Sequence, residues 1–154
     1  MAAPRTSVLF ELYAAGQLAN ELIGREFERR SLKVGAHSVL LLLERRGPLT
    51  PTELEGETGL RPSTLRERMQ PLFDGELVRR RPRRDDRRSH SLEVTARGRE
   101  LIRKTRPLVE AAERALAAEL GERLEVYREP LQRLVQGAQA TLAEQEERKP
   151  RNLT

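Results

Sequence analysis

The chain has 154 residues, of which 34% are charged, 3% are aromatic and none is cysteine. This length suits one domain with an additional arm, and its core must be aliphatic. The lack of cysteine excludes disulfides, thiolate metal sites and a cysteine redox switch. Because the chain has no long apolar run and its N-terminus lacks the apolar segment of a signal peptide, the sequence predicts a cytoplasmic protein without a membrane partner.

The net charge of +5 is confined to one part of the chain. Residues 61–88 contain ten basic and five acidic residues, so the rest of the chain is neutral overall. Seven of these basic residues are arginines between Arg79 and Arg88. A localised positive charge indicates a negatively charged partner, most often nucleic acid, but composition alone equally allows a solvated arginine-rich loop.

Apolar residues spaced by three and four predict a long first helix over residues 8–30. A second helix is predicted over residues 37–46, ended by Gly47 and Pro48. Thr50, Pro51 and Glu53 then form the capping pattern of a short third helix.

Gly59 ends the third helix, and Pro62 opens a fourth after a short connection. The buried side of this fourth helix is predicted to be Leu65, Met69, Leu72 and Phe73. Gly75 ends it, and two strands follow over residues 77–82 and 90–95. The arginine run therefore forms the loop of a hairpin.

Thr95 is placed to cap a long helix that Gly121 ends, and a last helix is predicted from Glu122 to about Glu147. Three prolines lie inside predicted helices, namely Pro71, Pro107 and Pro130. Each is expected to distort its helix or to move a boundary, because proline lacks the backbone N–H. An alternative for Pro130 is that it opens the final helix, with a separate short helix before it.

Helix, turn and helix followed by a hairpin is the order of a winged helix-turn-helix, whose second helix enters the DNA major groove. The predicted fold is mainly α with a small two- or three-stranded β-wing and with dimerisation helices at both ends of the chain. The wing arginines are suited to phosphates or to the minor groove. The predicted DNA contacts are Arg61, Ser63, Thr64, Arg66, Arg68, Gln70, Arg83, Arg84, Arg87 and Arg88.

The stretch from Leu49 to Leu72, followed by the wing sequence, resembles the MarR family (multiple-antibiotic-resistance regulators). The family's wing signature is represented by Asp86, Arg88, Val94, Thr95 and Gly98. The resemblance covers residues 8–145, nearly the whole chain. It implies a homodimeric DNA-binding regulator, mostly of the repressor type, that recognises pseudo-palindromic operators in double-stranded DNA.

The resemblance also implies a wing brace between Asp86 and Arg88, and a small aromatic or phenolic effector held between the dimerisation and DNA-binding lobes. The candidate pocket residues are Phe10, Tyr13, His37 and Leu41. For Phe10, Tyr13 and Tyr127, packing at the dimer interface is the alternative role. His37 is alternatively a structural histidine or a metal ligand, although two distant histidines without cysteine make a poor metal site.

The predicted organisation places flexible ends at residues 1–7 and 148–154, dimerisation helices at 8–32 and 107–147, and the winged helix-turn-helix at 33–106. The sequence contains no glycine-rich phosphate loop, nucleophile elbow or Cys/His pair, so no catalytic residues, metal or cofactor are predicted. The alternative function is that of a helical protein-interaction adaptor whose basic hairpin is incidental.

Overall fold

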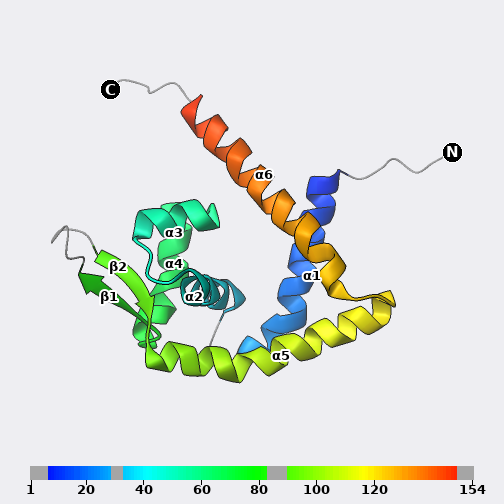
Figure 1. The fold of residues 1–154 in the computed structure, drawn as a ribbon, viewed down its shortest axis with the longest axis horizontal. Helices are drawn as coiled ribbons and strands as arrows, with labels where there is room; N and C mark the ends of the chain where they lie inside the picture. Colours follow the sequence, from blue (N-terminus) through cyan, green and yellow to red (C-terminus); the bar gives the residue numbers. More distant parts are fainter. Residues whose placement is uncertain (1–6, 29–32, 83–89, 149–154) are drawn as a thin grey trace.

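The computed structural model describes residues 7–28, 33–82 and 90–148. Its elements, in chain order, are α1 (Val8–Glu28), α2 (Val34–Arg46), α3 (Pro51–Thr58), α4 (Pro62–Asp74), β1 (Val78–Pro82), β2 (His90–Val94), α5 (Ala96–Leu120), the 3-10 helix η1 (Leu124–Tyr127) and α6 (Arg128–Glu147). Figure 1 shows a lobe made of α2, α3, α4 and the two strands, joined by the long helix α5 to an arm made of α1 and α6. This architecture confirms the predicted class, which is mainly α with a two-stranded wing.

The core of the lobe is aliphatic, as the low aromatic content predicted. Helix α2 lies at its centre and contacts α4, β2, α5 and α1. Leu40, Leu54 and Leu72 are completely buried. The remaining members of the core cluster are Ala36, Val39, Leu43, Leu65, Met69, Leu77, Val78, Leu92, Val94 and Ile102. Burial of these side chains stabilises the lobe and fixes the orientation of α4 within it.

The helices of the helix-turn-helix, α3 and α4, begin and end at the capping residues that the sequence predicted. Thr50 accepts a hydrogen bond from the Glu53 backbone N–H, and the Glu53 carboxylate accepts one from the Thr50 N–H, which completes the capping box. Gly59 ends α3 in the left-handed region at φ 63°, where glycine avoids the penalty of a side chain. Pro62 then begins α4, so the turn between the two helices is short.

The wing is an antiparallel pair in which Val78 lies opposite Val94 and Pro82 lies opposite His90. Leu49 adds a single bridge to Leu92, with backbone N···O distances of 3.2 and 2.7 Å. A third strand is therefore reduced to one residue pair. The wing tip, residues 83–89, lies outside the described residues.

Two predicted helix boundaries were wrong. Helix α2 begins at Val34, about one turn before His37. The last helix does not begin at Glu122, because the separate 3-10 helix η1 precedes α6, in which Pro130 is the third residue. This agrees with the alternative prediction for Pro130, since a proline in the first turn removes no intrahelical hydrogen bond.

The other two helical prolines do not move a boundary. Helix α4 continues past Pro71 to Asp74, and α5 continues past Pro107 to Leu120. Thr95 caps α5 by accepting a hydrogen bond from the Gly98 N–H, and Gly121 ends α5 at φ 68°. One long helix therefore connects the wing to the arm.

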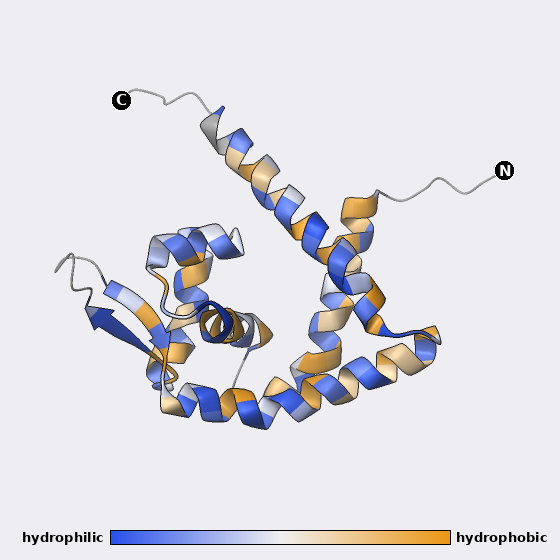
Figure 2. Ribbon diagram, in the orientation of Figure 1, coloured by the Kyte–Doolittle hydropathy of each residue, from blue (hydrophilic) through white to orange (hydrophobic). Residues whose placement is uncertain are grey.

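The arm exposes many apolar side chains. Figure 2 shows hydrophobic segments recurring along α1 and α6. These helices meet the lobe where Phe27 of α1 packs against His37 of α2, and where Gln139 of α6 donates a hydrogen bond to the Glu57 carbonyl oxygen of α3, at 2.7 Å. The exposed large hydrophobic residues of α1, the end of α5, η1 and α6 are Val8, Leu9, Phe10, Leu12, Tyr13, Leu18, Leu22, Leu116, Leu120, Val126, Tyr127, Leu131, Leu134, Val135 and Leu142. So many exposed apolar side chains are typical of an interaction site.

Candidate nucleic-acid interface

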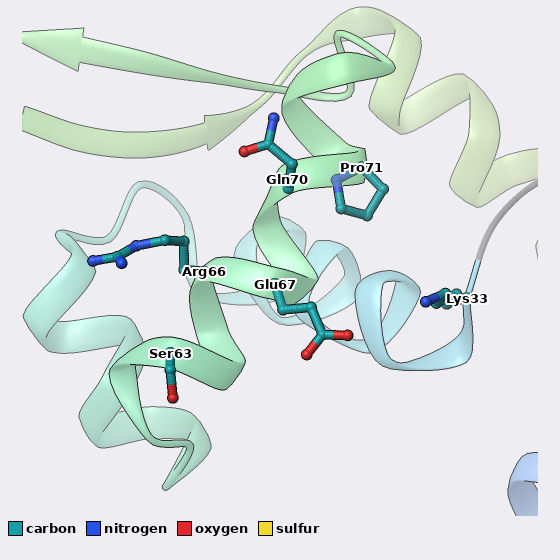
Figure 3. Close-up of a pocket in the computed structure, with 6 residues that line it drawn as sticks. All are labelled: Lys33, Ser63, Arg66, Glu67, Gln70 and Pro71. Atoms are coloured by element: carbon teal, nitrogen blue, oxygen red, sulfur yellow. The ribbon is translucent and has the colours of Figure 1, made fainter.

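The polar side of α4 faces outward from the lobe. Leu65, Met69 and Leu72 are buried, and the helical period therefore directs the intervening polar residues to the surface. Figure 3 shows these residues around a hollow of about 590 Å³, which is lined by Lys33, Ser63, Arg66, Glu67, Gln70 and Pro71. Arg66 and Gln70 project from one side of α4, and Glu67 projects toward α2.

The other three predicted DNA contacts of α4 do not all lie on this outward side. Arg61 is exposed at the N-cap of α4, and Thr64 is half-buried. The Arg68 guanidinium lies against the first turn of α2, where a Cβ added to Gly35 would be 3.0 Å from the Arg68 Nε. Arg68 is therefore directed at a neighbouring helix, and sequence spacing gave no signal of this contact.

The two acidic residues on α4, Asp74 and Glu67, differ in their contacts. Gln70 donates a hydrogen bond from Nε2 to Asp74 Oδ1, at 2.7 Å. Glu67 forms no ion pair within the described parts of the chain, which leaves its carboxylate facing the hollow.

A carboxylate organises the arginines at the base of the wing. Glu93 lies opposite Arg79 in the strand register and forms ion pairs with both Arg79 and Arg81. The hydrogen bond from Arg79, together with the positive charge of both arginines, holds the pKa of Glu93 below its ordinary value. Opposite charges that face each other across an antiparallel pair stabilise the sheet, so Glu93 contributes to the wing as well as to its charge balance.

Arg80 lies on the opposite face of β1 from Arg79 and Arg81. Its guanidinium carbon is 5.1 Å from the centroid of the Phe73 ring on α4, within the range of a cation–π interaction. The three described arginines of the run thus have partners inside the protein. The remaining predicted contacts at Arg83, Arg84, Arg87 and Arg88, and the brace between Asp86 and Arg88, lie outside the described residues.

The structure does not bring the four candidate pocket residues together within one chain. Phe10 and Tyr13 are exposed near the start of α1, whereas His37 contacts Phe27 near its end. At 1.5 Å per residue, Phe10 lies about 25 Å along the helix from Phe27. Leu41 is 40% exposed on α2.

His37 is buried and contacts residues of two other helices. Its Nε2 lies 2.7 Å from Thr105 Oγ1 on α5, and its ring centroid is 4.4 Å from that of Phe27 on α1. Burial lowers the pKa of His37, because it disfavours the charged imidazolium. These contacts agree with the structural role that was one of its predicted alternatives.

The described residues offer no obvious site for a metal ion and no membrane span. No group of three or more His, Asp or Glu side chains among them could hold a metal ion. None of the helices in these parts of the chain is both long enough and apolar enough to cross a bilayer.

The fold and the interface define a winged helix-turn-helix protein. Residues 32–90 match the model of the MarR family. The match includes α2, α3, α4 and β1 of the lobe and ends at the first residue of β2. No curated protein matches the chain at the level of its sequence.

Solved structures extend the likeness to the arm. Wild-type MarR from E. coli is 16% identical, with a TM-score of 0.71, over 86% of this chain and 98% of its own. The M. tuberculosis transcriptional regulator MOSR, solved in complex with DNA, is 24% identical, with a TM-score of 0.71, over 88% and 98%. CouR from Rhodococcus jostii RHA1, solved bound to p-coumaroyl-CoA, is 21% identical, with a TM-score of 0.70, over 86% and 92%.

Proposed function

We propose that the protein is a homodimeric transcriptional regulator of the MarR type that binds a pseudo-palindromic operator and acts as a repressor. The observation that carries this proposal is the outward polar face of α4 beside an arginine-rich wing, in the part of the chain that matches the MarR family model. In this arrangement α4 enters the major groove, and the wing follows the phosphates or the adjacent minor groove.

Electrostatics supports duplex DNA as the partner. The whole net charge of the chain is concentrated in residues 61–88, which span α4 and the wing. Of the predicted contacts on α4, Ser63, Arg66 and Gln70 face outward. Arg66 is suited to the acceptor pair of guanine, and Ser63, near the helix N-terminus, is suited to phosphate.

The exposed arm supports a homodimer. Helices α1 and α6 carry apolar side chains that the lobe of the same chain does not cover, and a second copy would bury them. Under this proposal the dimerisation helices are residues 8–32 and 107–147, and residues 33–106 form the DNA-binding domain. Two copies related by a two-fold axis read two half-sites of one operator.

A small aromatic or phenolic effector is part of the same proposal. The p-coumaroyl-CoA bound to CouR supports a ligand of this class for the fold. Because Phe10 and Tyr13 lie far from His37 in one chain, a pocket that uses all of them requires residues from both subunits. Adding phenolic acids during a binding measurement, and recording whether the duplex is released, tests this part separately.

The deciding experiment is selection of bound duplexes from a random pool by the purified full chain. A two-fold-symmetric motif is expected, with affinity that falls by about 10³–10⁵ between 50 and 200 mM salt if six to ten phosphates are contacted. Binding of no duplex at low salt, or affinity that salt does not change, would instead support a protein-interaction adaptor.

A further inference from the structure

The hydrogen bond between Gln70 and Asp74 fixes how the Gln70 amide can face a ligand. A carboxylate only accepts hydrogen bonds, so the amide nitrogen of Gln70 must be the group turned toward Asp74. The Nε2–Oδ1 distance is 2.7 Å, and the two residues are four positions apart on the exposed side of α4. The amide oxygen is therefore turned away from the carboxylate.

One N–H of the amide remains free beside this oxygen. The NH₂ group has two hydrogens, and Asp74 takes one of them. An amide has one N–H on the same edge as Oε1 and one on the far side. With Asp74 bound to the far-side N–H, the Oε1 edge presents a donor next to an acceptor. Adenine presents the matching pair in the major groove, with an acceptor at N7 and a donor at N6.

An acid at this place also has a cost for DNA binding. Asp74 is exposed at the end of α4, next to the arginine-rich wing, and its charge opposes the attraction to phosphates. Its benefit must then come from its contact with Gln70. A glutamine side chain loses considerable rotamer entropy when it is ordered, and a brace present before binding removes part of that loss.

We propose that Asp74 is a positioning residue for base recognition, which holds the Gln70 amide so that its free edge reads adenine in each half-site. This inference rests on the proposed function, because it assigns one base contact of the same interface. It differs from a role in helix stability alone, since a hydrogen bond between residues four apart would then affect folding without affecting base preference.

Duplex selection and competition binding with four variants of the full chain test the inference. Gln70→Ala is expected to lose the adenine preference at one position of each half-site. Asp74→Ala is expected to weaken that same preference about fivefold, as for the loss of one hydrogen bond, while binding to all duplexes becomes tighter. Asp74→Asn is expected to restore the preference, because its amide oxygen still accepts from Gln70.

Glu100→Ala is the control, because it removes one acid that pairs with Arg103 and Lys104 on α5, outside the α4 surface. It is expected to leave every base preference unchanged. If Asp74→Ala binds with wild-type preferences, or if Asp74→Asn behaves like Asp74→Ala, the inference is overturned while the proposed function stands. If the unaltered protein selects no duplex motif, both fail together.

Discussion

Gly98 is the residue at which the contact between wing and α5 is tightest. A Cβ at this position would lie 2.3 Å from the Leu77 carbonyl oxygen and 2.7 Å from a Val94 methyl carbon. Neither atom can retreat easily, because Leu77 and Val94 are part of the buried core. Glycine is needed here for close approach, while its φ lies outside the left-handed region.

We therefore expect Gly98→Ala to lower the free energy of unfolding by about 1–3 kcal/mol, the usual cost of overpacking. Gly56→Ala is the control, because a Cβ there meets no atom within 4 Å in the interior of α3. It is expected to stabilise the protein by roughly 0.5–1 kcal/mol, through helix propensity. Urea unfolding of both variants measures these effects; equal destabilisation by the two would contradict the proposed close approach.

His37 links three helices through one titratable ring. Burial lowers its folded pKa below the ordinary value of 6.5, so the unfolded chain binds its proton more readily. The stabilisation from neutral His37 is therefore complete above pH 6.5 and is lost as the pH falls toward the lowered folded pKa.

The thermal midpoint of unfolding should accordingly decrease when the pH is lowered from 7.5 to 5.5. His37→Gln retains a polar group opposite Thr105 but does not titrate, so it should flatten this part of the pH profile. The profile of His90→Gln, which alters the other histidine of the chain, should instead follow that of the unaltered protein. A profile unchanged by His37→Gln would show that another group causes the pH dependence.

In the wing, some arginines contact other parts of the protein and others are assigned to DNA. Glu93 engages Arg79 and Arg81, and Phe73 engages Arg80. These contacts join the base of the wing to its own return strand and to α4. The other arginines of the run, from Arg83 to Arg88, lie outside the described residues, and their assignment to DNA rests on the sequence alone.

Replacing Arg84 and Arg87 together by alanine is expected to weaken binding to all duplexes and to flatten the salt dependence. The slope of log affinity against log salt should fall by roughly 0.9 for each phosphate contact that is lost. Arg114→Ala with Arg123→Ala removes the same charge in the last part of α5 and at the N-cap of η1, and it should not change the slope. Fluorescence anisotropy at several salt concentrations measures both; an unchanged slope in the wing variant would reject the contact.

At the scale of the whole molecule, a single chain leaves the apolar side chains of its arm exposed. Leu131 and Leu134 lie on the apolar side of α6 and are 49% and 41% exposed. Because these side chains gain little from their own chain, burial against a second copy is the source of stability that we infer for the arm.

Leu131→Glu with Leu134→Glu is therefore expected to give a species of one chain mass, 17.6 kDa, by sedimentation velocity. Operator affinity should fall by about 100-fold or more, because two half-sites no longer bind as one unit. Gln136→Glu adds a charge on the opposite side of α6 and should remain dimeric. If the variant with both Leu131→Glu and Leu134→Glu still sediments as a dimer, the dimer interface does not include this side of α6.

The sequence by itself determined the local features of this protein. Capping boxes, prolines and glycines act through the backbone of a few neighbouring residues, which is why the bounds of α3 and α4 and the end of α5 followed from Thr50, Pro62 and Gly121. The aliphatic core and the confinement of charge to residues 61–88 were likewise fixed by composition and order.

Only the tertiary structure decided which side chains meet across elements. The contacts of Arg68 with α2, of Glu93 with two arginines, and of His37 with Thr105 join residues whose spacing in sequence carries no periodic signal. The same holds for the separation of Phe10 from His37, which follows from the length of α1 and from the packing of its end against α2. Long-range contacts depend on how helices pack in three dimensions, and the hydrophobic pattern of each helix records only which side is buried.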